Sequence, residues 1–131
     1  MSKVRVATCV PRQYWMQAEK MEWLDRAIGD NPCDIFLLSQ EFVGGGSMRE
    51  VCRLKGIKTD DVPVTIEWLQ EHVGGLCRKH HVHIGFGATV VRDGGINTEE
   101  YLYFDPSGVL LGSHVKMALP AEDRVRVPAV I

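Results

Sequence analysis

The fold of this chain is decided by the stretch Asp34-Ile35-Phe36-Leu37-Leu38-Ser39-Gln40-Glu41-Phe42. Consecutive apolar residues at 35–38 predict a short strand that is buried on both faces, as in a sheet covered by other layers. Asn31-Pro32 before this run and a glycine-rich loop after it favour a strand over a helix. The strand ends near one carboxylate, Glu41. Because functional groups of open α/β sheets gather at the carboxyl ends of strands, Glu41 is a candidate general base; a solvated acid is the alternative.

Composition places the chain among ordinary globular proteins. Its 131 residues are enough for one domain with its own core, so we expect a single domain over residues 1–131. The apolar content is 45%, the charged content 24% and the net charge -2, which gives no general attraction to nucleic acid or to an anionic membrane. No apolar run approaches the ~20 residues of a membrane span, and the N-terminus lacks the apolar core of a signal peptide. The cysteines form no CxxC pair and are typical of reduced thiols, so we expect a cytoplasmic protein.

Hydrophobic periodicity predicts an α/β fold. Residues 17–30 and 63–79 have the apolar spacing of amphipathic helices, and in the first of these the charged residues, including Lys20, are expected to face water. Residues 48–60 are expected to form a loop with a short helical turn, and strands are predicted at 4–10, 35–38, 82–91, 101–104 and 109–116. The order β-α-β-loop-α-β-β-β implies right-handed crossovers with the helices on one side of the sheet. The other face is expected to be covered too, because the central strand is apolar throughout.

Two short motifs suggest functions that their surroundings do not favour. Gly44-Gly45-Gly46-Ser47 resembles a phosphate-binding loop, but no Gly-Lys-Ser/Thr follows it and the GxGxxG spacing fails, which favours a flexible loop. His80-His81-Val82-His83 resembles a zinc site, but no fourth ligand has suitable spacing, and the segment lies where a helix is expected to end and a strand to begin. We therefore expect neither a metal nor a cofactor.

Two stretches resemble the nitrilase (carbon–nitrogen hydrolase) superfamily. The first begins with Lys3-Val4-Arg5-Val6-Ala7 and continues through the helix to the strand that ends in Glu41. The second is similar to that family's D-P-x-G-x-(hydrophobic)-x-G-x-Y-R-K segment and reads Phe104-Asp105-Pro106-Ser107-Gly108-Val109-Leu110-Leu111-Gly112-Ser113-His114-Val115-Lys116. The resemblance covers nearly all 131 residues but only the N-terminal half of a family member. It implies half of an α-β-β-α sandwich, with a mixed sheet and helices on one face.

The resemblance also implies catalytic roles within that family's Glu-Lys-Cys triad. Glu41 matches the glutamate that deprotonates the thiol, and Lys116 matches the lysine that stabilises the oxyanion. Glu122 matches an accessory glutamate of many members. Gln40 stands where the family usually has proline, and His114-Val115 stands where it has Tyr-Arg. No cysteine follows Lys116, so the resemblance implies a domain truncated before the nucleophile and inactive alone, which is a fragment, a natural half or a degenerate relative of the family.

Three interpretations follow. The first is a carbon–nitrogen hydrolase fragment or subunit that acts on a small amide, nitrile or carbamoyl substrate and whose fold is completed by a second copy or a second polypeptide. The second is a non-catalytic interaction module on the same scaffold. The third is a Mg²⁺-dependent endonuclease/exonuclease/phosphatase-like enzyme, because Asp34 to Glu41 resembles that family's D-I-x-x-L-Q-E strand. Against the third, Val10-Pro11 stands where that family has asparagine, and its later motifs are absent from the sequence.

Overall fold

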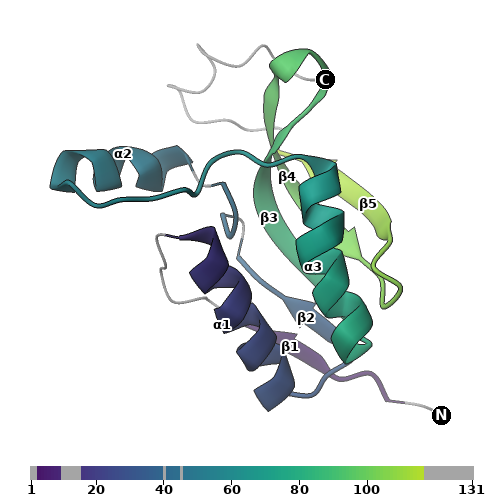
Figure 1. Ribbon diagram of the computed structural model, residues 1–131. Coiled ribbons are helices and arrows are strands. Elements are labelled where there is room, and N and C mark those ends of the chain that lie inside the picture. Colours follow the sequence, from purple (N-terminus) through teal and green to yellow (C-terminus); the bar gives the residue numbers. More distant parts are fainter. Residues whose placement is uncertain (1–2, 10–15, 40, 45, 117–131) are drawn as a thin grey trace.

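The computed structural model describes residues 3–9, 16–39, 41–44 and 46–116 (Figure 1). Both predicted amphipathic helices and all the predicted strands are present. The elements in chain order are β1 (Val6–Thr8), α1 (Gln17–Asp30), β2 (Ile35–Leu37), α2 (Gly46–Lys55), α3 (Ile66–His80), β3 (His83–Val91), the 3-10 turn η1 (Asp93–Gly95), β4 (Asn97–Phe104) and β5 (Leu110–Val115). None of the described helices is long and apolar enough to cross a membrane.

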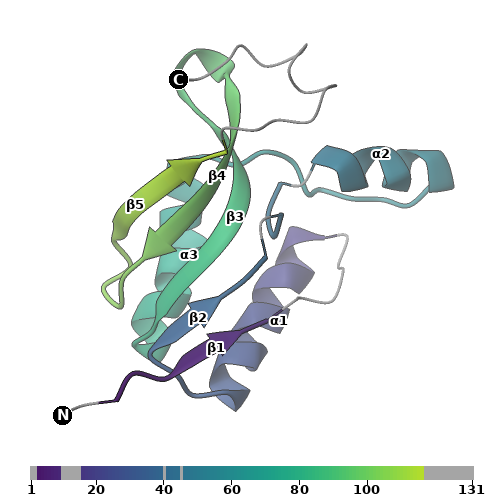
Figure 2. The same ribbon diagram turned by 180° about the vertical axis from the view of Figure 1, so that it is seen from behind.

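The strands form one mixed sheet in the order β1-β2-β3-β4-β5. β1, β2 and β3 run parallel, whereas β4 pairs antiparallel with β3 and with β5. Helices α1 and α3 lie together on one face of this sheet (Figure 1), and the view from behind shows the opposite face without a covering helix in the described part of the chain (Figure 2). We call these the helix side and the open side. The expected α/β class, with a mixed sheet and helices on one face, is confirmed.

The core lies between the sheet and the helices α1 and α3. Its largest members are aromatic: the rings of Phe86 and Phe104 stack with centroids 5.8 Å apart, and Phe42 meets Phe86 edge-on at 6.4 Å. The predicted apolar stripes of both helices supply the other side of the core, through the buried residues Leu24, Ile28, Leu69, Val73 and Cys77. Burial of each large apolar side chain of this kind stabilises the fold by about 1.5–3 kcal/mol.

The strand that was expected to be buried on both faces is fully buried on one. Phe36 points to the helix side and is 2% exposed, whereas its neighbours Ile35 and Leu37 point to the open side and are only half-buried. This difference arises because, within the described residues, no second layer covers the open side.

A helix, α2, covers residues 46–55, where a loop with a short helical turn was predicted for residues 48–60. Strong helix formers occupy its last three positions, 53–55, and Arg53 and Lys55 lie in the last turn, where positive charge is favourable. Gly56, at φ 67°, ends the helix, and the backbone N–H of Ile57 donates to the carbonyl of Cys52 as in a Schellman motif. This helix was not predicted because its start overlaps a glycine-rich stretch, which is typical of a loop.

A glycine in α3 permits close contact with the β4–β5 hairpin turn. A Cβ on Gly74 would lie 2.8 Å from the carbonyl oxygen of Gly108, which itself has φ +78°. The turn is further held by Asp105, whose Oδ1 accepts the N–H groups of Ser107 and Val109. Close helix packing therefore explains Gly74, but the neighbour is the hairpin turn and not the face of the sheet.

Candidate functional site

Glu41 lies beyond the carboxyl end of β2, which is at Leu37, in a segment that continues alongside β3. Ser39 accepts the N–H of Gly87 at 3.0 Å, and the Gly87 carbonyl in turn accepts the N–H of Phe42 at 3.0 Å. Backbone hydrogen bonds therefore fix the chain on both sides of Glu41, while its own side chain is exposed. An exposed carboxylate on a fixed backbone is suitably placed to meet a group outside this sheet.

Lys116 directly follows β5 and is held by β4. Its N–H donates to the carbonyl of Glu99 at 2.9 Å, and its ammonium lies 3.2 Å from the Glu99 carboxylate. Both side chains are about one-third exposed, so this ion pair is screened by solvent and open to exchange partners. Lys116 is thus a cation already engaged by a carboxylate that the sequence analysis did not single out.

The strand directions place Glu41 and Lys116 at one end of the sheet. β5 is antiparallel to β4 and β4 to β3, so β5 runs in the same direction as β3 and β2. The ladder aligns Gly87, beside Glu41, with Tyr101 of β4 and His114 of β5. Three strand spacings separate the two backbones, or roughly 14 Å at the usual interstrand distance. A direct contact between the two side chains stays a prediction, and Glu122 lies outside the described residues.

The pairing of Lys116 with Glu99 depends on an irregularity in the hairpin. Phe104 pairs with Leu110, but the next residue, Tyr103, pairs with Gly112, so Leu111 is an extra residue in β5. From there the register continues without a break to Glu100, and Lys116 follows opposite Glu99. The residue that holds the candidate lysine was therefore not predictable by counting outward from the turn.

Two of the described cysteines, Cys33 and Cys77, are not activated as nucleophiles. Cys9 and Cys33 are half-buried, and Cys52 and Cys77 are buried. Burial raises the pKa of Cys33, and raises that of Cys77 to about 12. At neutral pH Cys77 is therefore a protonated core residue, as is typical of a structural thiol.

The histidine cluster has structural contacts. His80 lies 2.6 Å from Asp25, which also accepts from Lys79, and these contacts tie α3 to α1. The hydrogen bonds from Lys79 and His80 hold the pKa of Asp25 below its ordinary value. His81 ends α3 with φ 52°. Across the described part of the chain, no three His, Cys, Asp or Glu side chains gather as metal ligands.

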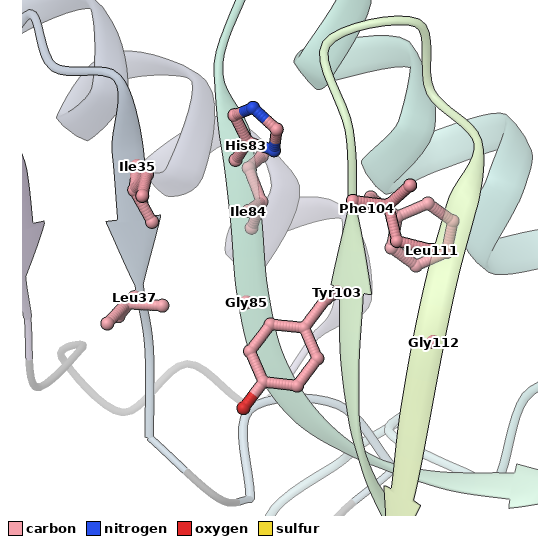
Figure 3. Close-up of a pocket in the computed structure, with 9 residues that line it drawn as sticks. All are labelled: Ile35, Leu37, His83, Ile84, Gly85, Tyr103, Phe104, Leu111 and Gly112. Atoms are coloured by element: carbon pink, nitrogen blue, oxygen red, sulfur yellow. The ribbon is translucent and has the colours of Figure 1, made fainter. Parts of the chain in front are cut away.

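A shallow groove of about 520 Å³ lies on the open side of the sheet (Figure 3). Nearly all of its surface is apolar, and Gly85 forms part of its floor because a Cβ there would lie 2.8 Å from the Leu37 side chain. Tyr103 extends across the groove in Figure 3, and Leu111, the extra residue of β5, lies at its far side. This surface has the character of a protein core that is not covered by the described residues.

No family sequence model matches the chain, and the comparison with curated proteins gives no match. Solved structures do match. A carbon–nitrogen hydrolase from Helicobacter pylori G27 aligns with a TM-score of 0.64 and 13% identity, over 91% of this chain and 41% of its own. An amidase variant from Nesterenkonia sp. AN1, with the acetamide moiety of fluoroacetamide on its active-site cysteine, aligns with a TM-score of 0.69 and 12% identity, over 98% and 48%. An N-terminal amidase with a Gln-Gly peptide gives 0.63 and 15%, over 92% and 29%.

These identities are too low to establish more than the fold, but the fold agrees closely. A further matching structure, also of the Nesterenkonia amidase, is described as belonging to the nitrilase superfamily. The chain spans less than half the length of the matching proteins. It therefore has the fold of the carbon–nitrogen hydrolases of the nitrilase superfamily, over part of their length.

Proposed function

We propose that this chain supplies the glutamate base and the lysine of a carbon–nitrogen hydrolase site whose nucleophilic thiol lies outside these 131 residues. One observation carries the proposal: Glu41 and Lys116 each follow a strand, and both lie at the same end of a sheet with the fold of amidases. Functional groups of α/β sheets gather at this end, where the parallel strands have their carboxyl ends.

The chemistry assigns a separate task to each residue. Glu41 takes the thiol proton, and the thiolate attacks the amide or nitrile carbon to form a tetrahedral or thioimidate intermediate. Lys116 stabilises the negative charge that develops on the substrate oxygen or nitrogen, and Glu99 keeps its ammonium oriented. For an amide, Glu41 then returns the proton to the leaving amine, and one water releases the acyl group as the acid and restores the thiol. For a nitrile, a first water adds to the thioimidate before ammonia leaves, and a second water releases the acid. Glu122 is proposed as an accessory acid near the same site.

The thiol has to come from elsewhere. An amidase variant from Nesterenkonia sp. AN1 has an active-site cysteine to which acrylamide has been added. In this sequence no cysteine follows Lys116, and Cys77 is held protonated in the core. A second polypeptide, a further segment or a second copy that covers the open side would complete the site, and the apolar groove supports this part of the proposal. The substrate class is a small amide, nitrile or carbamoyl compound.

A non-catalytic interaction module is the second candidate. The specific observation in its favour is the groove, whose lining is almost wholly apolar. An apolar surface of this kind binds a partner without any need for Glu41 or Lys116. The two candidates therefore differ in whether those two side chains matter.

The test uses the purified chain with a panel of small amides and nitriles. Alone, it is expected to give no turnover above buffer. With a small exogenous thiol in place of the cysteine, slow thiol-dependent turnover is expected, and Glu41→Gln or Lys116→Met should abolish it. Lys79→Met is the matched control, because this lysine pairs with Asp25 on the helix side.

Two results would contradict the proposal. Thiol-dependent turnover that survives both substitutions would show that Glu41 and Lys116 have no catalytic role and would favour the interaction module. Turnover without thiol that is lost in Glu41→Gln, yet kept when all four cysteines are replaced by serine, would replace the thiol mechanism with attack by water.

A further inference from the structure

A buried ion pair holds the segment that follows Glu41. Lys20 of α1 and Asp61, in the loop before α3, have side chains only 9% and 6% exposed. The Lys20 ammonium lies 2.6 Å from the Asp61 carboxylate and donates to the carbonyl of Phe42 at 2.7 Å. The second carboxylate oxygen of Asp61 accepts the N–H of Gly44 at 2.7 Å. The pair thus makes hydrogen bonds to the backbone at Phe42 and at Gly44, both within three residues of Glu41.

The loop that carries Asp61 is itself anchored to α1. The N–H of Asp61 donates to the hydroxyl of Thr59 at 3.0 Å. Gln17, the first residue of α1, donates its N–H to the Asp60 carboxylate at 2.7 Å and its side-chain amide to the Val62 carbonyl at 3.3 Å. Asp61 is therefore held in place by contacts that are independent of its hydrogen bond with Gly44.

The backbone N–H, the carbonyl and the ring of Phe42 are all held by contacts. Its N–H donates to Gly87 of β3, its carbonyl accepts from Lys20, and its ring lies between Trp23 of α1 and Phe86 of β3, at 6.1 and 6.4 Å. The position of the next residue back in the chain, Glu41, is determined by these contacts, because its carbonyl carbon belongs to the same peptide plane as the Phe42 nitrogen.

Stability alone does not account for the ion pair. Two buried charges lose their hydration, and a well-packed apolar pair of similar volume is commonly as stable or more so. An apolar pair, however, has no donor for the Phe42 carbonyl and no acceptor for the Gly44 N–H. Gly44 is also tightly enclosed at φ +73°, with a Cβ there meeting Thr89 and Pro63 backbone atoms at 3.0 and 3.2 Å. The polar pair therefore specifies one path for this segment.

We propose that Lys20 and Asp61 are positioning residues that set the place of the Glu41 carboxylate. The catalytic meaning of this inference rests on the proposed function, but its structural content does not. The ion pair touches neither the substrate nor the thiol and acts only through residues 42–44.

The test is the double variant Lys20→Met/Asp61→Asn. It removes both charges and the donor to Phe42 while keeping an oxygen that accepts from Gly44. Amide exchange at residues 42–44 is expected to become at least about tenfold faster, with the β3–β4 amides within about twofold, and the carboxyl ¹³C resonance of Glu41 is expected to move. In the thiol-dependent assay, kcat should fall about tenfold with KM within about twofold.

Two controls separate positioning from general loss of stability. Leu24→Ala removes a fully buried side chain of α1 that takes no part in the hydrogen bonds of residues 42–44, and it should leave the Glu41 resonance in place. Lys79→Met repeats the lysine substitution at an ion pair whose lysine is 60% exposed. Asp60→Ala, at an exposed residue, loosens only the loop anchor and gives a folded variant in which exchange at Gly44 should rise about threefold.

The positioning proposal is overturned if the double variant, or Asp60→Ala should the double variant not fold, leaves exchange at residues 42–44 unchanged. It is equally overturned if Leu24→Ala moves the Glu41 resonance as far. If Glu41→Gln has no effect in the thiol assay while amide exchange at residues 42–44 is faster in the double variant, the proposed function is rejected. The ion pair then remains the feature that holds this segment.

Discussion

The two sides of the sheet are built from the same strands but differ in what covers them. On the helix side, Phe86 and Phe104 are fully buried. On the open side, Val6, Tyr103 and Leu111 are 53%, 45% and 62% exposed. Strand residues alternate between the two sides, and in β4 the buried residues accordingly occupy every second position.

The difference separates what holds this fold from what the fold offers to partners. The helix side supplies the packed core between the sheet and α1 and α3, and it is complete within the described residues. The open side carries the apolar groove and, at one end, the Lys116–Glu99 pair. We therefore expect substitutions on the helix side to change stability, and those on the open side to change association or activity.

The largest effect is expected from Phe86→Ala. Phe86 is fully buried and contacts the rings of Phe42 and Phe104, so its loss leaves a cavity and should lower the free energy of unfolding by about 3–5 kcal/mol. Urea denaturation followed by circular dichroism measures the loss. The matched change on the open side, Tyr103→Ala, should cost less than about 1 kcal/mol. Equal costs would show that the two sides contribute alike to stability.

A smaller loss is expected from Glu100→Gln, at the polar end of the helix side. The Glu100 side chain is fully buried and receives hydrogen bonds from Arg92 and Thr98. Burial alone would raise the pKa of Glu100, but those hydrogen bonds outweigh it and lower the pKa below the ordinary 4.5. Because Arg92 is 40% exposed, solvent screens its ion pair with Glu100. We therefore expect Glu100→Gln to lower the free energy of unfolding by about 1–3 kcal/mol at pH 7.

The pH dependence checks the cause of that loss. A carboxylate whose pKa is lowered by folding contributes stability that is present above its unfolded pKa and is lost as pH falls through the folded pKa. The difference between the wild type and Glu100→Gln should therefore be constant above about pH 5 and shrink below 4.5. A difference that stays constant down to pH 3 would assign the loss to packing instead.

Alkaline pH should weaken the helix side through Cys77. Folding raises the pKa of this thiol from 9.0 to about 12, so the unfolded chain releases a proton in that window and the native chain does not. The free energy of unfolding should fall by up to about 1.4 kcal/mol per pH unit between those values. Cys77→Ala should have a shallower slope over the same range, whatever its stability at pH 7. Identical slopes would exclude Cys77 as the cause.

The smallest change in stability, within about 0.5 kcal/mol, is expected from Leu111→Ser on the open side. Its effect should appear in association: we expect the wild-type chain to scatter light as a species larger than 14.7 kDa, and the variant to associate more weakly. Light scattering over a wide concentration range makes the measurement. A wild-type monomer at micromolar concentration that binds little hydrophobic dye would show that the open side needs no cover.

Local patterns were enough to predict most of the fold. Helix α1 runs from Gln17 to Asp30 as expected, because its apolar stripe is regular and Asn31-Pro32 follows it. β4 was predicted from Tyr101 but begins at Asn97, because its first residues are polar and are stabilised by long-range contacts, namely the pairing with β3 and the polar contacts of Glu99 and Glu100. Sequence periodicity registers burial of apolar side chains and not of polar ones, so this start was missed.

The candidate site was less predictable for the same reason. The positions of Glu41 and Lys116 at strand ends followed from the sequence, but their surroundings depend on long-range contacts. Lys20 was expected to face water, as a charged residue on an amphipathic helix, and is instead 7% exposed because Asp61, distant in sequence, supplies a buried counter-charge. No local pattern identifies such a partner.

The extra residue Leu111 determines on which side of the sheet Lys116 lies. If the pairing of Phe104 with Leu110 continued without the bulge, Lys116 would lie opposite Thr98, which is buried on the helix side, and not opposite Glu99. Deleting one residue between Gly112 and Lys116 while the bulge is kept would place the candidate lysine opposite Glu100, on the helix side, whereas deleting Leu111 itself would remove the bulge and keep Lys116 opposite Glu99. The length of the hairpin and its bulge are therefore coupled: the loss of one residue keeps Lys116 on the open side only when the bulge is lost with it.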